Sequence, residues 1–278
     1  MKRYIILGCC RSGTTVTHLA IKGHPNVCAL NDELLVTPFF NKGISSFTQG
    51  NDLEIEKRNG HKRIFDAITS IQKNKKTQYI GVKTSLIYNR GSMDYIKHVL
   101  STYFPDIKII LTIRNDLVAQ YGSLIRALKT GKHHSWDKSK KDIKTLISIN
   151  KYLFMKYLLD CFWFIDNMRD LKKTHDVLEF SYEEDIINGE YKKLFDFLEL
   201  DYVEINWLTA KKVAPKPEDY IKNYKSLTNL SRKLESMHYN DGLSMKYHLI
   251  NKIVCNYVTT RKKTKKILNI LRNKGEER

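Results

Sequence analysis

A short apolar run that leads through a glycine-bounded turn into a helix is the feature that most constrains the fold. Residues 4–7 are apolar, as in a buried strand, and residues 14–21 carry apolar side chains at helical spacing. Gly8 and Gly13 lie between them with the glycine spacing of a phosphate-binding loop. Glycine lets such a loop curl so that successive N–H groups point at one anion, and the dipole of the following helix adds to the attraction. The segment predicts the opening of an α/β domain that holds an anion.

The rest of the chain alternates between strand and helix patterns. Three more runs are typical of strands, at residues 79–82, 108–113 and 177–180. Helical patterns lie between and after them, at residues 57–76, 93–103, 117–129, 143–168 and 191–198. Such alternation predicts a parallel sheet with helices on its faces. We therefore expect an α/β fold: a single P-loop-type domain with a central, mostly parallel sheet flanked by helices, over residues 1–258, and a basic helical tail over residues 259–278.

Composition narrows the class of partner. The 278 residues are 42% hydrophobic and 28% charged, as in ordinary globular proteins, and the net charge of +18 predicts attraction to anions. The five cysteines form no metal-type spacing, which favours a reduced, cytoplasmic setting and no metal site. No apolar run approaches the roughly 20 residues of a membrane span. The basic tail around Ile267, Leu268, Ile270 and Leu271 is either an amphipathic helix that contacts a membrane or a solvated terminal helix.

The loop sequence separates this chain from nucleotide triphosphatases. Those enzymes place Lys directly after the second glycine, whereas this chain has Thr14 there and carries its cation inside the loop, as Arg11. The run Arg11-Ser12-Gly13-Thr14-Thr15 resembles the loop of sulfotransferases that use 3′-phosphoadenosine-5′-phosphosulfate (PAPS). The resemblance implies an enzyme that moves a sulfuryl group from PAPS to a hydroxyl and releases 3′,5′-adenosine bisphosphate (PAP). These five residues are then expected to bind the donor.

PAPS carries a 3′-phosphate that ATP lacks, so a protein that uses it needs a second anion site. Arg114 directly follows the strand predicted at residues 108–113, and Ser123 lies on the next predicted helix, off its apolar stripe. The carboxyl ends of parallel strands are where open α/β sheets bind ligands. Arg114 and Ser123 are therefore the candidate 3′-phosphate residues.

The segment of residues 114–131, with Trp136 beyond it, is similar to the trehalose 2-sulfotransferase-like bacterial family. In that family an Arg and a Ser at the spacing of Arg114 and Ser123 bind the 3′-phosphate. Most other sulfotransferases place the Ser one residue earlier, where this chain has Gly122. Residues 180–184 and 194–198 look like the strand-then-helix segment common to sulfotransferases. A later set resembles a C-terminal segment that closes over the donor: Lys211, Lys212, Lys216, Asn223 and Tyr224.

Sulfuryl transfer needs a base for the acceptor proton and cations for the sulfuryl and phosphate oxygens. The resemblance implies Glu33 as the base, and burial of a carboxylate raises its pKa and improves it as a base at neutral pH. Asp32, His18 and His24 remain alternatives. Arg11 and Lys83 are the expected catalytic cations, so no metal is required.

The resemblance implies a small hydroxyl acceptor, and a carbohydrate or glycolipid is the expected type, with a pocket formed by the region after Glu33 and residues 132–136. Two other classes stay open. A P-loop kinase needs Lys after Gly13 and an acid at a strand end, and the candidate acid, Asp166, lies in a helical pattern. A basic nucleic-acid-binding protein fits the charge but explains neither anion site, and no nucleic-acid motif is present, so no nucleic-acid partner is expected.

Overall fold

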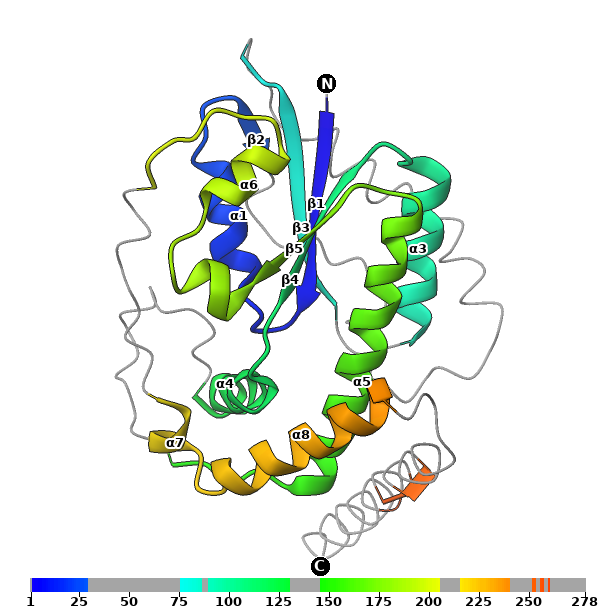
Figure 1. Cartoon of the computed structure of the whole chain (residues 1–278), viewed down its shortest axis with the longest axis vertical. Coiled ribbons are helices and arrows are strands. Elements are labelled where there is room, and N and C mark those ends of the chain that lie inside the picture. Colours follow the sequence, from blue (N-terminus) through cyan, green and yellow to red (C-terminus); the bar gives the residue numbers. More distant parts are fainter. Residues whose placement is uncertain are drawn as a thin grey trace, which may run out of the picture. The chain divides into compact units, whose positions relative to one another are not determined.

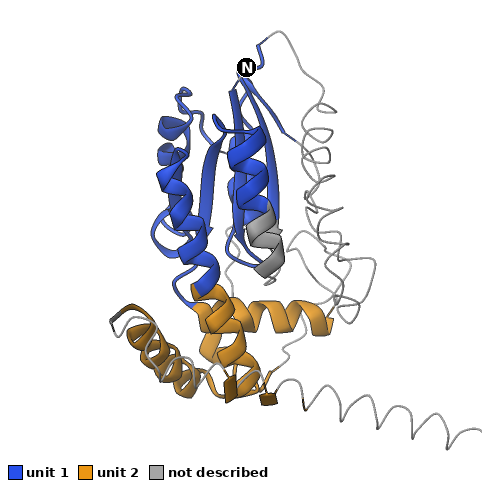
Figure 2. Cartoon of the chain, turned by 90° about the vertical axis from the view of Figure 1, so that its right-hand side faces the viewer, with its two compact units in different colours: residues 1–116, 163–213 blue, residues 117–162, 214–278 orange. Residues whose placement is uncertain are grey.

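The computed structural model describes residues 2–29, 76–86, 90–130, 146–205, 216–240, 252–253, 256–257 and 260. The chain divides into two compact units (Figure 2): unit 1 comprises Met1–Asp116 and Trp163–Val213, and unit 2 comprises Leu117–Phe162 and Ala214–Arg278. Apart from Lys76, the helix predicted over residues 57–76 lies outside the described residues. Residues 30–75, which include Asp32 and Glu33, also lie outside them, as do residues 131–145 and 261–278.

Unit 1 is built on a parallel sheet. Its strands are β1 (Lys2–Cys9), β2 (Val27–Ala29), β3 (Tyr79–Leu86), β4 (Lys108–Ile113) and β5 (Val177–Ser181). They run in the order β2-β3-β1-β4-β5, and every pair is parallel. The predicted α/β fold with a parallel sheet is confirmed. The sequence patterns missed β2, because three residues are too few to show a period.

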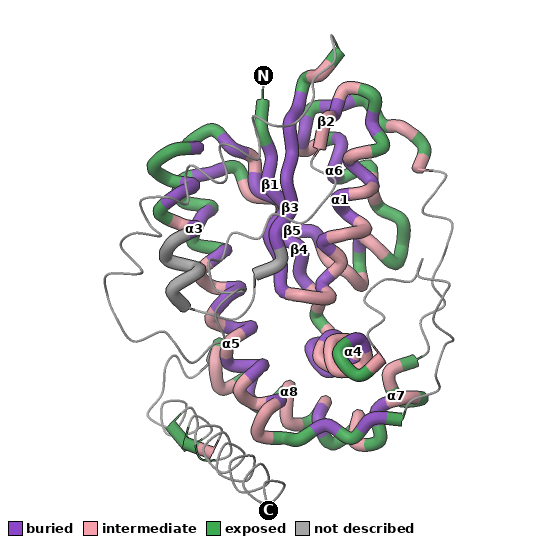
Figure 3. The backbone as a smooth tube through the Cα atoms, turned by 180° about the vertical axis from the view of Figure 1, so that it is seen from behind, coloured by how far each residue is buried: buried purple, intermediate pink, exposed green. Residues whose placement is uncertain are grey.

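Helices cover both faces of this sheet (Figure 1). Helix α1 (Thr14–Lys22) and helix α6 (Lys192–Phe197) lie on one face, and α3 (Arg90–Tyr103) and the end of α5 (Lys151–Arg169) lie on the other. The core on the first face includes Tyr4, Ile6, Ile21, Ile110, Phe180, Leu194 and Phe195. Burial on both faces explains why β4 is apolar apart from Lys108 and Thr112 and why the centre of the sheet is buried throughout (Figure 3).

A tightly held turn follows β5 in unit 1. This turn, η4 (Tyr182–Ile186), begins at Ser181, whose Oγ accepts the N–H of Glu184 at 3.3 Å. Asp185 is only 4% exposed. Its carboxylate accepts a hydrogen bond from the N–H of Ser181 at 2.7 Å and forms an ion pair with Lys193 at 2.8 Å. These contacts fix the turn on the end of the sheet.

Unit 2 is helical in its described part, with α4 (Leu117–Thr130), the start of α5, α7 (Pro217–Tyr220) and α8 (Tyr224–Asn240). The helix predicted from residue 143 begins only at Lys151. Asn150 causes this start, because its Oδ1 accepts the N–H groups of Tyr152 and Leu153 at 3.1 Å each. The preceding Ile147 instead bridges to Ile221.

The apolar stripe predicted on α4 differs from the buried face. Leu128 belongs to the stripe but is 64% exposed, whereas Gln120 and Gly122 are buried. A Cβ at Gly122 would lie 2.3 Å from Cδ1 of Ile221, so any larger residue there would force the end of that side chain to move. Ser123, the serine of this helix, is the next residue.

Charge is divided unevenly between the units. Each contains 24 Lys and Arg, but unit 1 has 21 Asp and Glu, a net +3, while unit 2 has 9, a net +15. The lysines are spread along the chain as the sequence suggests, and the asymmetry comes from the scarcity of acids in unit 2. No helix within the described ranges is long and apolar enough to cross a membrane.

Candidate active site

The glycine-bounded loop leaves the central strand of the sheet and enters α1 at once. Arg11 and Gly13 both have left-handed backbones, with φ of 70° and 102°. The N–H of Ser12 donates to the carbonyl of Cys9 at 3.1 Å, and the N–H of Thr17 donates to Gly13 at 3.0 Å. Left-handed residues within a turn orient consecutive N–H groups toward one side, which makes an anion-binding concavity.

The N-terminus of α1 adds to this concavity. Gly13 is its N-cap and supplies no side-chain acceptor. The first N–H groups of a helix point out of its N-terminal end, here toward the loop. Thr14 is 4% exposed, while Thr15 is half-buried. The predicted donor residues Arg11 to Thr15 thus form one continuous turn whose dipole favours a phosphate or sulfate group.

A hydroxyl pair locks the loop to β4. Ser12 Oγ lies 2.8 Å from Thr112 Oγ1, which donates in turn to the carbonyl of Leu7 at 3.3 Å. Ser12 is 1% exposed, so its hydroxyl anchors the loop. The sequence patterns did not single out Thr112, although a polar residue near the end of an apolar strand was a usable signal.

Arg114 lies against the same loop. It directly follows β4, the neighbour of β1, and its Nη1 donates to the carbonyl of Arg11 at 3.3 Å. Its guanidinium carbon is 4.2 Å from the ring centroid of Tyr182, and its Nε lies 3.7 Å from Glu183 Oε1. The side chain is 13% exposed. The structure thus brings together the two arginines that the sequence proposed for two different phosphate groups.

Tyr182 and Glu183 are residues whose part in this site the sequence missed. They belong to η4, in the segment that sequence likeness marked only as a common strand-then-helix unit. Their contact with Arg114 depends on the pairing of β4 with β5, which brings the ends of both strands together. No local pattern in the sequence carries that information.

Lys83 lies inside β3 rather than after it, since this strand extends to Leu86. It is paired in register with Ile6, and partners in parallel strands share a face of the sheet. That face is the one covered by α1, and Lys83 is only 6% exposed there. Gly8, where the loop begins, pairs with Ser85, two residues after Lys83. Lys83 therefore places a buried positive charge on the α1 side of the sheet, close in register to the loop.

The remaining predicted residues fall elsewhere. Ser123 is on α4, in unit 2, and is half-buried. Glu33 and Asp32 lie outside the described residues. Their roles stay predictions.

The two candidate histidines occupy different ends of α1. His18 is inside the helix, 1% exposed and one turn after Thr14. His24 follows the C-terminal end of the helix, 3% exposed, where its Nδ1 accepts the N–H of Asn26 at 3.0 Å and its ring lies against Phe195. His24 is therefore a packed core residue at the far end of α1 from the anion loop.

His24 predicts an acid-sensitive fold. Burial lowers its pKa below the usual 6.5, although a hydrogen bond to the backbone of Asp201 opposes the shift. A depressed pKa means that the unfolded chain binds the proton more tightly, so stability falls as the pH drops below about 6.5. We expect Tm to fall less between about pH 7.5 and 5.5 in His24→Asn, which keeps an acceptor for Asn26, than in the native chain. The exposed His98→Asn is the matched control, and equal pH profiles for all three would contradict this assignment.

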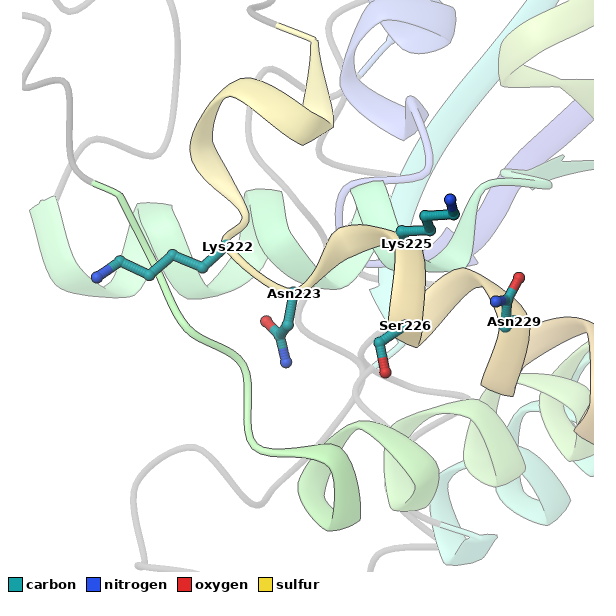
Figure 4. Close-up of a pocket in the computed structure, with 5 residues that line it drawn as sticks. All are labelled: Lys222, Asn223, Lys225, Ser226 and Asn229. Carbon is teal, nitrogen blue, oxygen red and sulfur yellow. The ribbon is translucent and has the colours of Figure 1, made fainter.

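Unit 2 contains an open pocket of about 500 Å³ at the start of α8. It is lined by Lys222, Asn223, Lys225, Ser226 and Asn229, and its two lysines extend in different directions (Figure 4). The amide of Asn223 clamps the segment before α5, because it accepts the N–H of Ile149 at 3.1 Å and donates to its carbonyl at 2.8 Å. Asn223, part of the predicted closing segment, therefore has a structural role within unit 2.

The fold and the loop together define a class of protein. A parallel α/β sheet whose central strand leads through an arginine-bearing, glycine-bounded turn into a helix is a P-loop-type domain suited to phosphate-like anions. The model of the Sulfotransferase family matches residues 4–204, which is most of the chain. The chain belongs to the sulfotransferase family. It is thus a sulfotransferase enzyme, and the kinase and nucleic-acid alternatives are set aside.

Solved sulfotransferase structures are similar to this chain at low sequence identity. A sulfotransferase from Alicyclobacillus acidocaldarius is 13% identical, with a TM-score of 0.47, over 86% of this chain and 94% of that one. A mouse sulfotransferase complexed with PAP is 13% identical, with a TM-score of 0.48, over 93% and 89%. The sulfotransferase domain of the Synechococcus olefin synthase is 15% identical, with a TM-score of 0.43, over 84% and 94%. No curated protein sequence matches significantly. The narrower likeness to trehalose 2-sulfotransferases stays a prediction.

Proposed function

We propose that this enzyme takes its sulfuryl group from PAPS, transfers it to a hydroxyl of a carbohydrate or glycolipid, and releases PAP. One observation carries the choice of donor: the guanidinium of Arg114 touches the carbonyl of Arg11. A second cation is therefore built beside the phosphate-binding loop but is separate from it. A donor with phosphate groups at both its 5′ and 3′ positions fits such a pair of sites.

In the proposed reaction, the acceptor oxygen bonds to sulfur while the bond between sulfur and the 5′-phosphate oxygen breaks. Arg11 and the N–H groups at the start of α1 offset the charge on the transferred group and on the leaving phosphate. Lys83, buried on the face of the sheet that α1 covers, adds positive charge. Glu33 takes the acceptor proton, with Asp32 and His18 as the alternatives. In-line positioning and electrostatics then supply most of the catalysis, as in phosphoryl transfer.

The positive charge of unit 2 bears on whether the acceptor is neutral or anionic. Its net +15 favours a partner that is itself anionic, because fields of one sign raise the local concentration of opposite charges. An acceptor screen should therefore include sugars with carboxylate or sulfate groups and sugars on anionic lipid, beside neutral sugars. Contact of the basic tail with a membrane is part of this proposal. Residues 261–278 of that tail lie outside the described residues.

Calorimetry with PAP and AMP in magnesium-free buffer tests the donor. We expect PAP to bind clearly better than AMP and Arg114→Ala to weaken PAP about ten- to hundredfold, because a hydrogen bond to a charged group is worth about 1.5–3 kcal/mol. Arg169→Ala is the matched control, since Arg169 is the last residue of α5 and pairs with Glu179 of β5. If PAP binds no better than AMP, or if Arg114→Ala changes nothing, the second phosphate site is wrong.

A further inference from the structure

One carboxylate organises the residues around Arg114. Glu183 Oε2 accepts the N–H of Asn115 at 2.9 Å, and its Oε1 accepts the N–H of Asp116 at 3.3 Å. The same Oε1 lies 3.7 Å from Nε of Arg114. Glu183 therefore contacts three consecutive residues at the point where the chain leaves β4.

These contacts leave Nη2 of the Arg114 guanidinium available to bind a phosphate group. Glu183 attracts the Nε edge, the Tyr182 ring lies 4.2 Å from the guanidinium carbon, and Nη1 donates to Arg11. Within the described ranges, Nη2 of Arg114 makes no hydrogen bond. With Nε beside Glu183 and Nη1 on Arg11, the N–H groups of Nη2 remain as the donors for a phosphate oxygen.

The turn that carries Glu183 is itself fixed. Its base is tied by Ser181 and by the buried Asp185, which holds the N–H of Ser181 and the ammonium of Lys193. The Glu183 side chain is 30% exposed, so its ion pair is not deeply buried. The carboxylate is therefore placed by its turn and not merely by attraction to Arg114.

We infer that Glu183 is a positioning residue for the 3′-phosphate site: it holds Arg114 in the rotamer that faces the bound anion and orders residues 115–116 beside it. The inference rests on the proposed use of PAPS. Electrostatics alone predicts the opposite effect on PAP binding, because a carboxylate near a phosphate site repels the phosphate. Removing its charge without a positioning role would therefore strengthen PAP binding, whereas loss of positioning weakens it. The sign of the effect separates the two.

The test is calorimetry of PAP and AMP with the native chain, Glu183→Gln and Glu183→Ala. Gln preserves the size of the side chain and one acceptor oxygen, so it keeps the test valid if the alanine variant folds poorly. We expect PAP affinity to fall about tenfold in Glu183→Gln, the scale on which residues that orient a ligand-binding side chain act, with AMP affinity unchanged. Glu184→Gln is the matched control, because Glu184 is the exposed neighbour on the same turn.

Selective loss of PAP in the Glu183 variants, with Glu184→Gln like the native chain, supports the inference. Unchanged or tighter PAP binding overturns it, and so does equal weakening of PAP and AMP, which indicates general distortion of the loop. The proposed function fails differently: the native chain then shows no preference for PAP over AMP, or Arg114→Ala has no effect. If the native chain prefers PAP over AMP, and Arg114→Ala loses this preference while Glu183→Gln keeps it, only the positioning role of Glu183 is rejected.

Discussion

Replacing Arg11 by alanine is expected to lower kcat for sulfuryl transfer by about 10²- to 10³-fold, the usual cost of removing one preorganised group that stabilises transition-state charge. Arg11 is the cation inside the anion loop, and the loop is held by the Ser12–Thr112 hydroxyl pair and by Arg114. The backbone that carries Arg11 is thus in place before the substrate binds. Release of PAP in a steady-state assay gives the measurement.

Two further variants separate charge from backbone strain at this position. Arg11 has a φ of 70°, which glycine adopts without strain and alanine does not. If the cation matters, Arg11→Gly and Arg11→Ala lose similar activity, and Arg11→Lys retains part of it. Arg3→Ala, an exposed change at the other end of β1, should behave like the native enzyme. Full activity in Arg11→Gly would show that the cation is not catalytic.

Gly8→Ala is expected to have the largest structural effect. A Cβ at Gly8 would lie 2.1 Å from Thr112 Oγ1, 2.6 Å from Ser12 Oγ and 2.7 Å from Thr14 Cγ2. These atoms cannot move cheaply, because the two hydroxyls bond each other and Thr112 also bonds the backbone. Overpacking of this kind costs about 1–3 kcal/mol of folding free energy or more, and relief by shifting the loop destroys the anion site.

Urea unfolding and PAP calorimetry together check this result. We expect Gly8→Ala to lower the denaturation midpoint and to abolish measurable PAP binding. Gly189→Ala is the control for a methyl group added without a steric clash, because its Cβ meets nothing within 4 Å. Its φ of 79° makes alanine strained there, so we expect some loss of stability in this control but native PAP binding. Adding Thr112→Ala to Gly8→Ala removes the closest contact and should restore part of the stability. Native-like PAP binding by Gly8→Ala would refute the described loop packing.

The sequence alone determined the frame of this protein. Residues 4–7 and 109–111 are apolar without interruption, a local property that follows from burial on both faces of a sheet, and both proved to lie in parallel strands. The glycine spacing and Arg11 marked the anion loop, because a tight turn between strand and helix requires particular residues at particular positions.

The tertiary structure alone decided how the site is held together. Ser12 meets Thr112 across 100 residues of sequence, and Glu183 meets the N–H of Asn115 across 68, because β4 pairs with β1 on one side and β5 on the other. Such contacts depend on strand order, which no local periodicity contains. The same holds for the contact of Gly122 with the side chain of Ile221 and for the concentration of positive charge in unit 2.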